Sequence, residues 1–463
     1  MVKTGLGRVR GLGEGGAVVF RGLPYAAAPE GPRRFLPPAP PEGWDGVREA
    51  TVFGTAPPQP PPAPQVPPVW KPGDGLGCLT LNVWSPEVGS TGLPVMVWLY
   101  GGMWRYGWTG MPQYDAATLA EGGVVVVTVD YRLGFEGFGH LPGVPGNRGL
   151  RDQIAALHWV QDNITAFGGD PGRVTIFGQS AGAASVALLA ATPSAEGLFH
   201  RVIAQSIPDG YLSVAEAEQV TRTLAEAAGV SATWAGMAEL PPEALLAVPP
   251  SGDAPGTNPF GPVIDGDLVT GPPGRGPRPD VDLICGFTHE EFRGIAPGLD
   301  ASGIDLTVAA ARLGLGPDAA DAYRRTYSGG DGPFVAMMSD ALVRMPTTWV
   351  AEAHAEAGGR TWLYDITWQG PTLGAAHGID VPLTFGNGDT RFAARLLGSP
   401  PPPTFTALSE RIRTAWTSFA TTGDPGWPRF QPHDRRTRLW DIEPINAPYP
   451  LTESRRLWPA RTR

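Results

Sequence analysis

Short apolar runs alternate along this chain with stretches of helical spacing, and this alternation constrains the fold more than any other feature. The runs are bounded by Gly and Pro and are rich in Val, Leu and Trp, which is typical of strands buried on both faces of a sheet. We expect strands at residues 17–20, 79–84, 94–100, 124–129, 174–177, 283–286 and 362–366. Because strands that alternate with helices form parallel sheets covered on both faces, the sequence predicts an α/β fold with a large, mostly parallel central sheet.

Helices are predicted where apolar residues recur at helical spacing. Residues 149–167 carry Ile154, Leu157, Val160 and Ile164 on one face. Further helices are expected at residues 181–191, 214–228, 339–357 and 406–419, with a break or kink at Pro346 in the third of these. Some of these helices are insertions between strands. No internal repeat or linker separates two halves, so we expect one domain over residues 1–463.

Composition excludes several classes of protein. With 463 residues and 42% hydrophobic residues the chain can bury a sizeable core. Its net charge of −10, without a basic cluster, argues against nucleic-acid binding. No apolar run reaches the length of a membrane span, and no signal-peptide pattern opens the chain. Cys78 and Cys285 are too few for a disulfide framework, although one bond between them stays possible, and we expect a cytoplasmic protein.

The candidate nucleophile is Ser180, in the pentapeptide GQSAG at residues 178–182. This segment lies between a predicted buried strand and a helix of small residues. A serine on such a tight turn projects its hydroxyl from the backbone, and the helix N-terminus can stabilise an oxyanion. The pentapeptide alone is a weak signal in so glycine-rich a chain, because a strand-to-helix turn can carry an incidental serine.

Segments along most of the chain, from Gly16 to about Asp441, resemble the type-B carboxylesterases, a group that includes the cholinesterases. The similar segments are FRGLPYA at residues 20–26, RF at 34–35, CLTLNVW at 78–84, DYRLG at 130–134, residues 146–170, FGPVIDG at 260–266 and TGDP at 422–425. The resemblance implies an α/β-hydrolase fold, a serine carboxylesterase, and no metal or organic cofactor. Independently, no group of His, Cys or carboxylate residues has metal-ligand spacing.

The resemblance also implies the partners of the nucleophile. The family's acid matches Glu291 in the segment HEEF at residues 289–292, and Glu290 is the neighbour most easily confused with it. The family's base matches His377, in a glycine-flanked loop. The chain order serine, acid, histidine agrees with this fold. His354, by contrast, is expected on the surface of a helix, and His433 lies in a charged tail.

The family's oxyanion loop corresponds to YGGMW at residues 100–104. The backbone N–H groups of Gly102, Met103 and Ala181 are the expected oxyanion donors. Methionine stands where the family usually has glycine or alanine. We expect Met103 to narrow the acyl side of the site or to divert the loop, unless its side chain packs outward.

Other positions bear on the substrate. Gln179 replaces the acidic residue that cholinesterases carry beside the serine, which weakens a cation–π site at the similarly placed Trp70 and argues against a cholinesterase. Ser206 matches a serine that supports the acid. Trp70, Trp104 and Trp108 indicate a pocket for uncharged hydrophobic or aryl esters, although tryptophans at such positions are as often part of the core.

The sequence therefore predicts an enzyme that binds a small-molecule ester, without nucleic-acid or membrane partners, as a monomer or small homo-oligomer. Two alternatives stay open. The same triad can act on amide, carbamate or polyester-oligomer bonds, because leaving-group preference depends on pocket shape. A catalytically silent binding protein is the other alternative, but such relatives typically lack a triad member.

Overall fold

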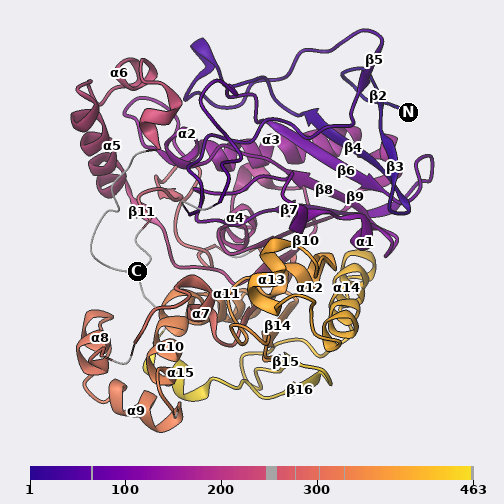
Figure 1. Cartoon of the computed structure of the whole chain (residues 1–463). Coiled ribbons are helices and arrows are strands. Elements are labelled where there is room, and N and C mark those ends of the chain that lie inside the picture. The colour runs from indigo at the N-terminus through magenta and orange to yellow at the C-terminus, as the bar shows by residue number, and fades with distance from the viewer. Residues whose placement is uncertain (64–65, 247–257, 277, 302, 328, 460–463) are drawn as a thin grey trace.

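A computed structural model describes residues 1–463 except 64–65, 247–257, 277, 302, 328 and 460–463. Its centre is an eleven-stranded sheet with the strand order β16-β15-β14-β13-β10-β9-β7-β8-β6-β4-β3 (Figure 1). The strands are β3 (Leu12–Glu14), β4 (Ala17–Pro24), β6 (Thr80–Ser85), β7 (Leu93–Leu99), β8 (Val125–Val129), β9 (Gly169–Gln179), β10 (Arg201–Gln205), β13 (Asp282–Thr288), β14 (Thr361–Ile366), β15 (Thr437–Trp440) and β16 (Ile445–Ala447). Every predicted strand is present.

The sheet is parallel at its centre and antiparallel at its edges. Strands β8, β7, β9, β10, β13, β14 and β15 pair in parallel, each with its neighbour in that order. The flanking pairs β6–β8, β4–β6, β3–β4 and β15–β16 are antiparallel. Because the carboxyl ends of parallel strands meet at one edge of a sheet, loops that follow the central strands gather there.

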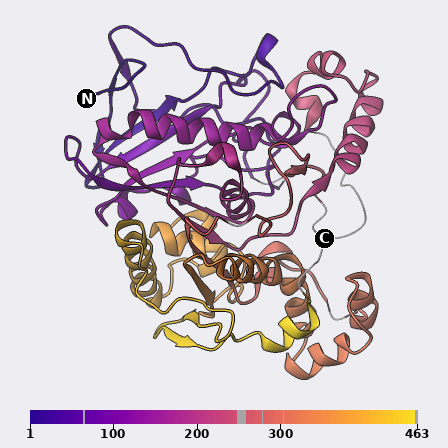
Figure 2. The ribbon, with the colours of Figure 1, turned by 180° about the vertical axis from the view of Figure 1, so that it is seen from behind.

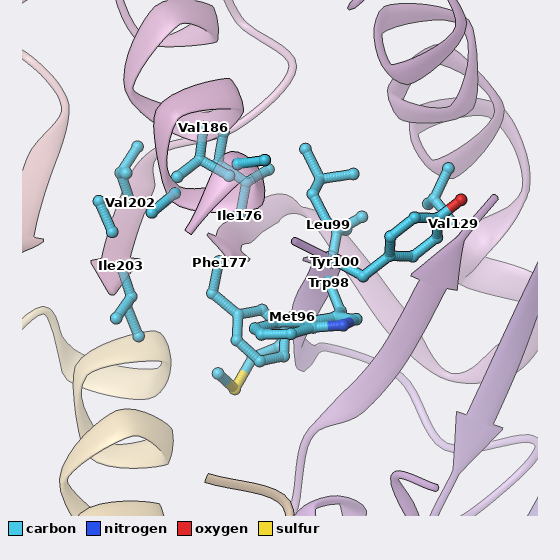
Figure 3. Close-up of a cluster of buried hydrophobic side chains, with 14 of the residues drawn as sticks. Met96, Trp98, Leu99, Tyr100, Val129, Ile176, Phe177, Val186, Val202 and Ile203 are labelled. Carbon is cyan, nitrogen blue, oxygen red and sulfur yellow. The ribbon is translucent and has the colours of Figure 1, made fainter. Parts of the chain in front are cut away.

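Helices cover both faces of the sheet. The principal ones are α3 (Arg148–Asn163), α4 (Ala181–Leu189), α11 (Met345–Glu356), α12 (Asp380–Phe385) and α14 (Thr404–Thr422). Helix α5 (Val214–Ala228) instead contacts a separate two-stranded sheet of β11 (Leu212–Ser213) and β12 (Val263–Ile264). Figure 2 shows α3 and α14 on opposite sides of the strands, as in Figure 1. Successive strand residues point to opposite faces: Ile176 and Val202 lie toward α4, whereas Phe177 and Ile203 lie on the face of the yellow helix α14 (Figure 3). This alternation explains why the strands are apolar throughout.

The predicted helix 339–357 differs from expectation in its details. Helix α10 (Gly332–Ser339) continues into a π-helical turn, η6 (Asp340–Arg344), which leads into α11. Pro346 lies in the first turn of α11, where its missing N–H is tolerated. The irregularity therefore falls just before the proline, in the π turn.

His354 was expected on a helix surface, and this expectation was wrong. Its side chain is buried, with Nδ1 2.7 Å from Thr361 Oγ1 and Nε2 2.9 Å from the carbonyl oxygen of Val281. An alanine-rich helix can pack on any face, so its sequence pattern does not show which side faces the core.

A smaller apolar cluster lies beside the main core. It packs α10 with α8 (Leu306–Arg312) and α9 (Ala319–Thr326) and includes Phe292, Tyr323 and Met337. Cys78 and Cys285 are both free and buried. Within the described ranges, no helix has the length and apolar character needed to cross a bilayer.

Candidate active site

Ser180 occupies a strained turn between β9 and α4. Its backbone has φ 57° and ψ −124°, a combination that residues with a side chain rarely adopt. The turn also brings helix and strand into contact, since a Cβ on Gly182 would lie 1.9 Å from the carbonyl oxygen of Leu99. The glycine is therefore required, and the serine hydroxyl is held out at the carboxyl end of the sheet.

Glu291 is the first residue of the short helix α7 (Glu291–Ile295), and its side chain is fully buried. Its Oε1 accepts hydrogen bonds from Ser206 Oγ at 2.6 Å and from the backbone N–H of Thr288 at 2.8 Å. Its Oε2 is hydrogen-bonded to Nδ1 of His377. The structure thus brings together three of the predicted site residues, from three separate parts of the chain.

Glu290 faces away from the imidazole. Its Oε1 accepts from Arg293 Nε at 2.8 Å, and its Oε2 accepts from the backbone N–H of Ala375 at 3.1 Å. Neighbouring carboxylates therefore have different partners, and only Glu291 contacts the ring of His377.

The His377 ring bridges Glu291 and Gln179. With Nδ1–H donating to the carboxylate, the Nε2 lone pair is left as an acceptor, and Gln179 Nε2 lies 3.2 Å from it. Both Ser180 and His377 are described, yet no hydrogen bond joins the serine hydroxyl to the ring. The Gln179 amide therefore occupies the ring nitrogen to which the candidate nucleophile, Ser180, is expected to donate.

Burial lowers the pKa of His377, but the charge of Glu291 and its hydrogen bond outweigh this effect, so the pKa is raised above 6.5. A further buried carboxyl lies nearby. Desolvation, followed by the charge of Glu291, raises the pKa of Asp380 to about 7. Its Oδ2 accepts from Gln205 Nε2 at 3.1 Å. Asp380 stands three residues after His377, and its sequence pattern predicted no role for it.

The candidate oxyanion loop is tightly wound. Gly102, Met103 and Trp104 all have positive φ values, of 112°, 57° and 52°. The carbonyl oxygen of Gly102 accepts from the N–H groups of Arg105 and Tyr106 at 3.0 and 2.9 Å. Met103 is 45% exposed, which favours the outward alternative, and its carbonyl oxygen accepts from the side chain of Asn258.

The N–H groups predicted as oxyanion donors come from two elements. Gly102 and Met103 follow β7, and Ala181 begins α4 directly after Ser180. Across the described part of the chain, none of these three N–H groups donates to another residue. They are therefore available to a substrate oxygen.

The three tryptophans have internal contacts. Trp104 is 2% exposed, and its Nε1 donates to Ser185 Oγ at 3.1 Å. Trp70 is 3% exposed, and its Nε1 donates to the carbonyl oxygen of Gly75 at 3.0 Å. These contacts favour the core alternative for both. Trp108 is partly exposed and donates to the carbonyl of Gly54 at 3.1 Å.

A mostly parallel sheet with a strained serine at the turn from β9 to α4, and an acid and a histidine after β13 and β14, defines an α/β-hydrolase. The chain belongs to the carboxylesterase family, whose model matches residues 1–309 and 321–445. It is therefore a carboxylic-ester hydrolase. Among the described residues, no group of three or more His, Cys, Asp or Glu side chains is arranged to hold a metal ion.

Relatives cover nearly the whole chain. Para-nitrobenzyl esterase of Bacillus subtilis (strain 168) is 33% identical over 100% of this chain and 99% of its own length. Liver carboxylesterase of Sus scrofa is 33% identical over 89% of this chain and 83% of its own. The crystal structure of the Geobacillus stearothermophilus carboxylesterase EST55 at pH 6.2 superposes with a TM-score of 0.87, at 33% identity and 99% coverage of both chains.

Proposed function

We propose that this esterase acts through Ser180 as nucleophile, His377 as general base and Glu291 as the acid that orients the imidazole. His377 Nε2 takes the proton of the serine hydroxyl as the oxygen attacks the ester carbonyl. The N–H groups of Gly102, Met103 and Ala181 stabilise the oxyanion. Collapse of this intermediate expels the alcohol, which receives the proton, and leaves an acyl-enzyme that water hydrolyses with His377 again as base.

The observation that carries the proposal is the environment of Glu291. Its carboxylate is buried, and each oxygen has a defined donor: Ser206 and the Thr288 N–H on one, His377 Nδ1 on the other. This arrangement fixes the tautomer of the ring so that Nε2 is an acceptor. For proton transfer, the Gln179 amide must leave Nε2 so that the Ser180 hydroxyl can donate to this nitrogen.

For the substrate, we propose uncharged hydrophobic or aryl esters. Support comes from a neutral Gln179 beside the nucleophile and from a para-nitrobenzyl esterase among the relatives. Of the sequence-predicted pocket tryptophans, Trp108 keeps partial exposure. We further propose a cytoplasmic enzyme, a setting compatible with two free cysteines, that acts as a monomer or small homo-oligomer, which sedimentation measurements can determine.

The test compares two neighbouring carboxylates. We expect Ser180→Ala to abolish hydrolysis of p-nitrophenyl acetate, and Glu291→Gln to lower kcat by roughly 10⁴-fold, as loss of the correct tautomer does in serine hydrolases. Glu290→Gln is the matched control and should lose far less activity, because Glu290 does not contact the ring. Equal losses for the two glutamine variants would leave Glu291 without its proposed role.

A further inference from the structure

The π-helical turn η6 carries a buried ion pair that the proposed mechanism does not use. Arg344 Nε donates to Asp340 Oδ1 at 2.7 Å, and the two side chains are 1% and 0% exposed. π turns are rare and often occur at functional sites. A buried ion pair is weak evidence for stability, because desolvation offsets much of the attraction. The question is therefore what this pair positions.

Arg344 holds the backbone on one side of Glu291. Its Nη1 donates to the carbonyl oxygen of His289 at 2.7 Å, while its Nη2 donates to the carbonyl oxygen of Ala336 at 2.8 Å. On the other side of the acid, the N–H of Phe292 donates to Ser339 Oγ at 3.0 Å. The helix that contains the π turn thus fixes the chain both before and after Glu291.

The same helix also holds the segment that carries Ser206. The N–H of Ile207, the next residue, donates to Thr347 Oγ1 at 3.0 Å, and the N–H of Asp209 donates to the carbonyl oxygen of Leu342 at 3.0 Å. Because Ser206 donates to Glu291, both segments that meet at the carboxylate are attached to one support.

A chain of hydrogen bonds continues outward from the ion pair. Tyr323 Oη donates to Asp340 Oδ2 at 2.6 Å, and Trp458 Nε1 donates to Tyr323 Oη at 2.6 Å. Asp340 is therefore held from two sides, and the guanidinium of Arg344 is fixed against it. Networks of this kind are rigid when every member has a partner.

We propose that Arg344 is a positioning residue of this esterase, which places the Glu291 carboxylate against His377 by holding the carbonyl of His289 from the π turn. The inference rests on the proposed triad. Arg344 touches neither the ring nor a reacting atom. Arg344 acts instead on the alignment of Glu291. The reaction rate is sensitive to this alignment, because a displacement of about 1 Å can lower the rate on the order of 100-fold.

Arg344→Met removes the donors and keeps much of the volume. We expect kcat for p-nitrophenyl acetate to fall roughly 10- to 100-fold with KM little changed. The acid limb of the pH profile of kcat/KM should move to lower pH, since a misaligned Glu291 stabilises the His377 imidazolium less. Asp380 is the other carboxyl group whose charge raises the pKa of this ring. Arg344→Lys, which keeps one charged donor, should restore part of the rate.

A matched pair of tyrosines tests the network without altering the ion pair. Tyr323→Phe removes the hydroxyl that holds Asp340, whereas Tyr25→Phe removes a buried hydroxyl that donates to the carbonyl oxygen of Asp130, outside the helix that contains the π turn. We expect only Tyr323→Phe to shift the acid limb and lower kcat. If Arg344→Met does not fold, this pair and Arg344→Lys decide the question.

Normal kcat and an unshifted acid limb in folded Arg344 variants would overturn the proposal. The Glu291→Gln variant separates this result from failure of the triad. If Glu291→Gln is inactive while the Arg344 and Tyr323 variants behave as the parent, only the positioning role is wrong. If Glu291→Gln keeps its activity, the acid itself is misassigned and the positioning role falls with it.

Discussion

Two side chains are candidates to donate a hydrogen bond to Nε2 of His377, which has one lone pair. The Gln179 amide lies 3.2 Å from Nε2, and the mechanism requires the Ser180 hydroxyl to donate to the same atom. The Gln179 amide can donate a hydrogen bond to Nε2 only while Nε2 is unprotonated. Once the ring is protonated, Nε2–H needs an acceptor, which Gln179 can offer only by turning its amide oxygen toward the ring.

We therefore expect Gln179→Glu to raise the pKa of His377 further. That pKa already lies above 6.5 because of Glu291, and a second carboxylate would stabilise the imidazolium from the Nε2 side. Since the base must be unprotonated, the acid limb of kcat/KM moves to higher pH, and activity at low pH falls. The measurement is a pH profile with p-nitrophenyl acetate.

Gln219→Glu on the exposed face of α5 is the control for this prediction, because it adds the same charge far from the ring. Its profile should match the parent's. An unshifted limb in Gln179→Glu would mean that the side chain does not face the imidazole in solution.

At the level of elements, the candidate oxyanion loop combines conformational strain with an exposed methionine. Met103 has φ 57°, in the left-handed region where a side chain costs about 1–2 kcal/mol. The loop is held there by Trp104, whose indole is anchored to Ser185 and whose carbonyl accepts from the Gly134 N–H at 2.7 Å. The strain is therefore imposed by the packing around the loop.

Met103→Gly should relieve this strain. The gain is partly offset by the larger entropy of glycine in the unfolded chain, so we expect a net stabilisation of up to about 1 kcal/mol in denaturant unfolding. Met103→Ala is the control, because alanine removes the same side chain but keeps the left-handed cost. It should give no stabilisation. A more stable alanine variant would mean that the methionine side chain, not the backbone, is the unfavourable feature.

The same pair of variants resolves the predicted effect on acyl groups. If the side chain crowds the carbonyl, both variants improve hydrolysis of bulky-acyl esters; if the loop conformation limits these substrates, only Met103→Gly does. Because Met103 is 45% exposed, we expect Met103→Ala to leave the hydrolysis of bulky-acyl esters unchanged.

Regular elements were the most predictable part of the molecule. Helix α5 has its expected bounds because its period and its Ser213 cap are local. Strand β9 begins five residues before the predicted run, because residues 169–173 are glycine, proline and charged residues that show no apolar period. The π turn escaped prediction, since one of its contacts, from Arg344 to the carbonyl oxygen of His289, joins residues 55 positions apart in the chain. For the same reason the Gln179–His377 contact could not be read from sequence, although each residue was singled out.

At the scale of the whole molecule, strand order explains why the site can form at all. Strands β9, β10, β13 and β14 are consecutive neighbours in the sheet. Each is followed at its carboxyl end by one member of the candidate site: Ser180, Ser206, Glu291 and His377 in that order. Four residues that span nearly 200 positions of the chain, from 180 to 377, thus converge at one edge of a rigid parallel sheet.

This dependence on the sheet leads to a prediction about cooperativity. We propose that the chain is one domain, because the main core takes residues from Val2 to Trp458 and shares Ile295, Leu313 and Leu342 with the smaller cluster around α8, α9 and α10. Denaturant unfolding should then show a single transition, in which tryptophan fluorescence, far-UV circular dichroism and esterase activity coincide. The most informative alternative result is that the smaller cluster unfolds first. In that case the amides of α8, α9 and α10 would exchange hydrogen at lower denaturant concentration than the amides of the central sheet. Such unfolding would release Tyr323 from Asp340 and the π turn behind Glu291, so activity would disappear while the sheet remained folded.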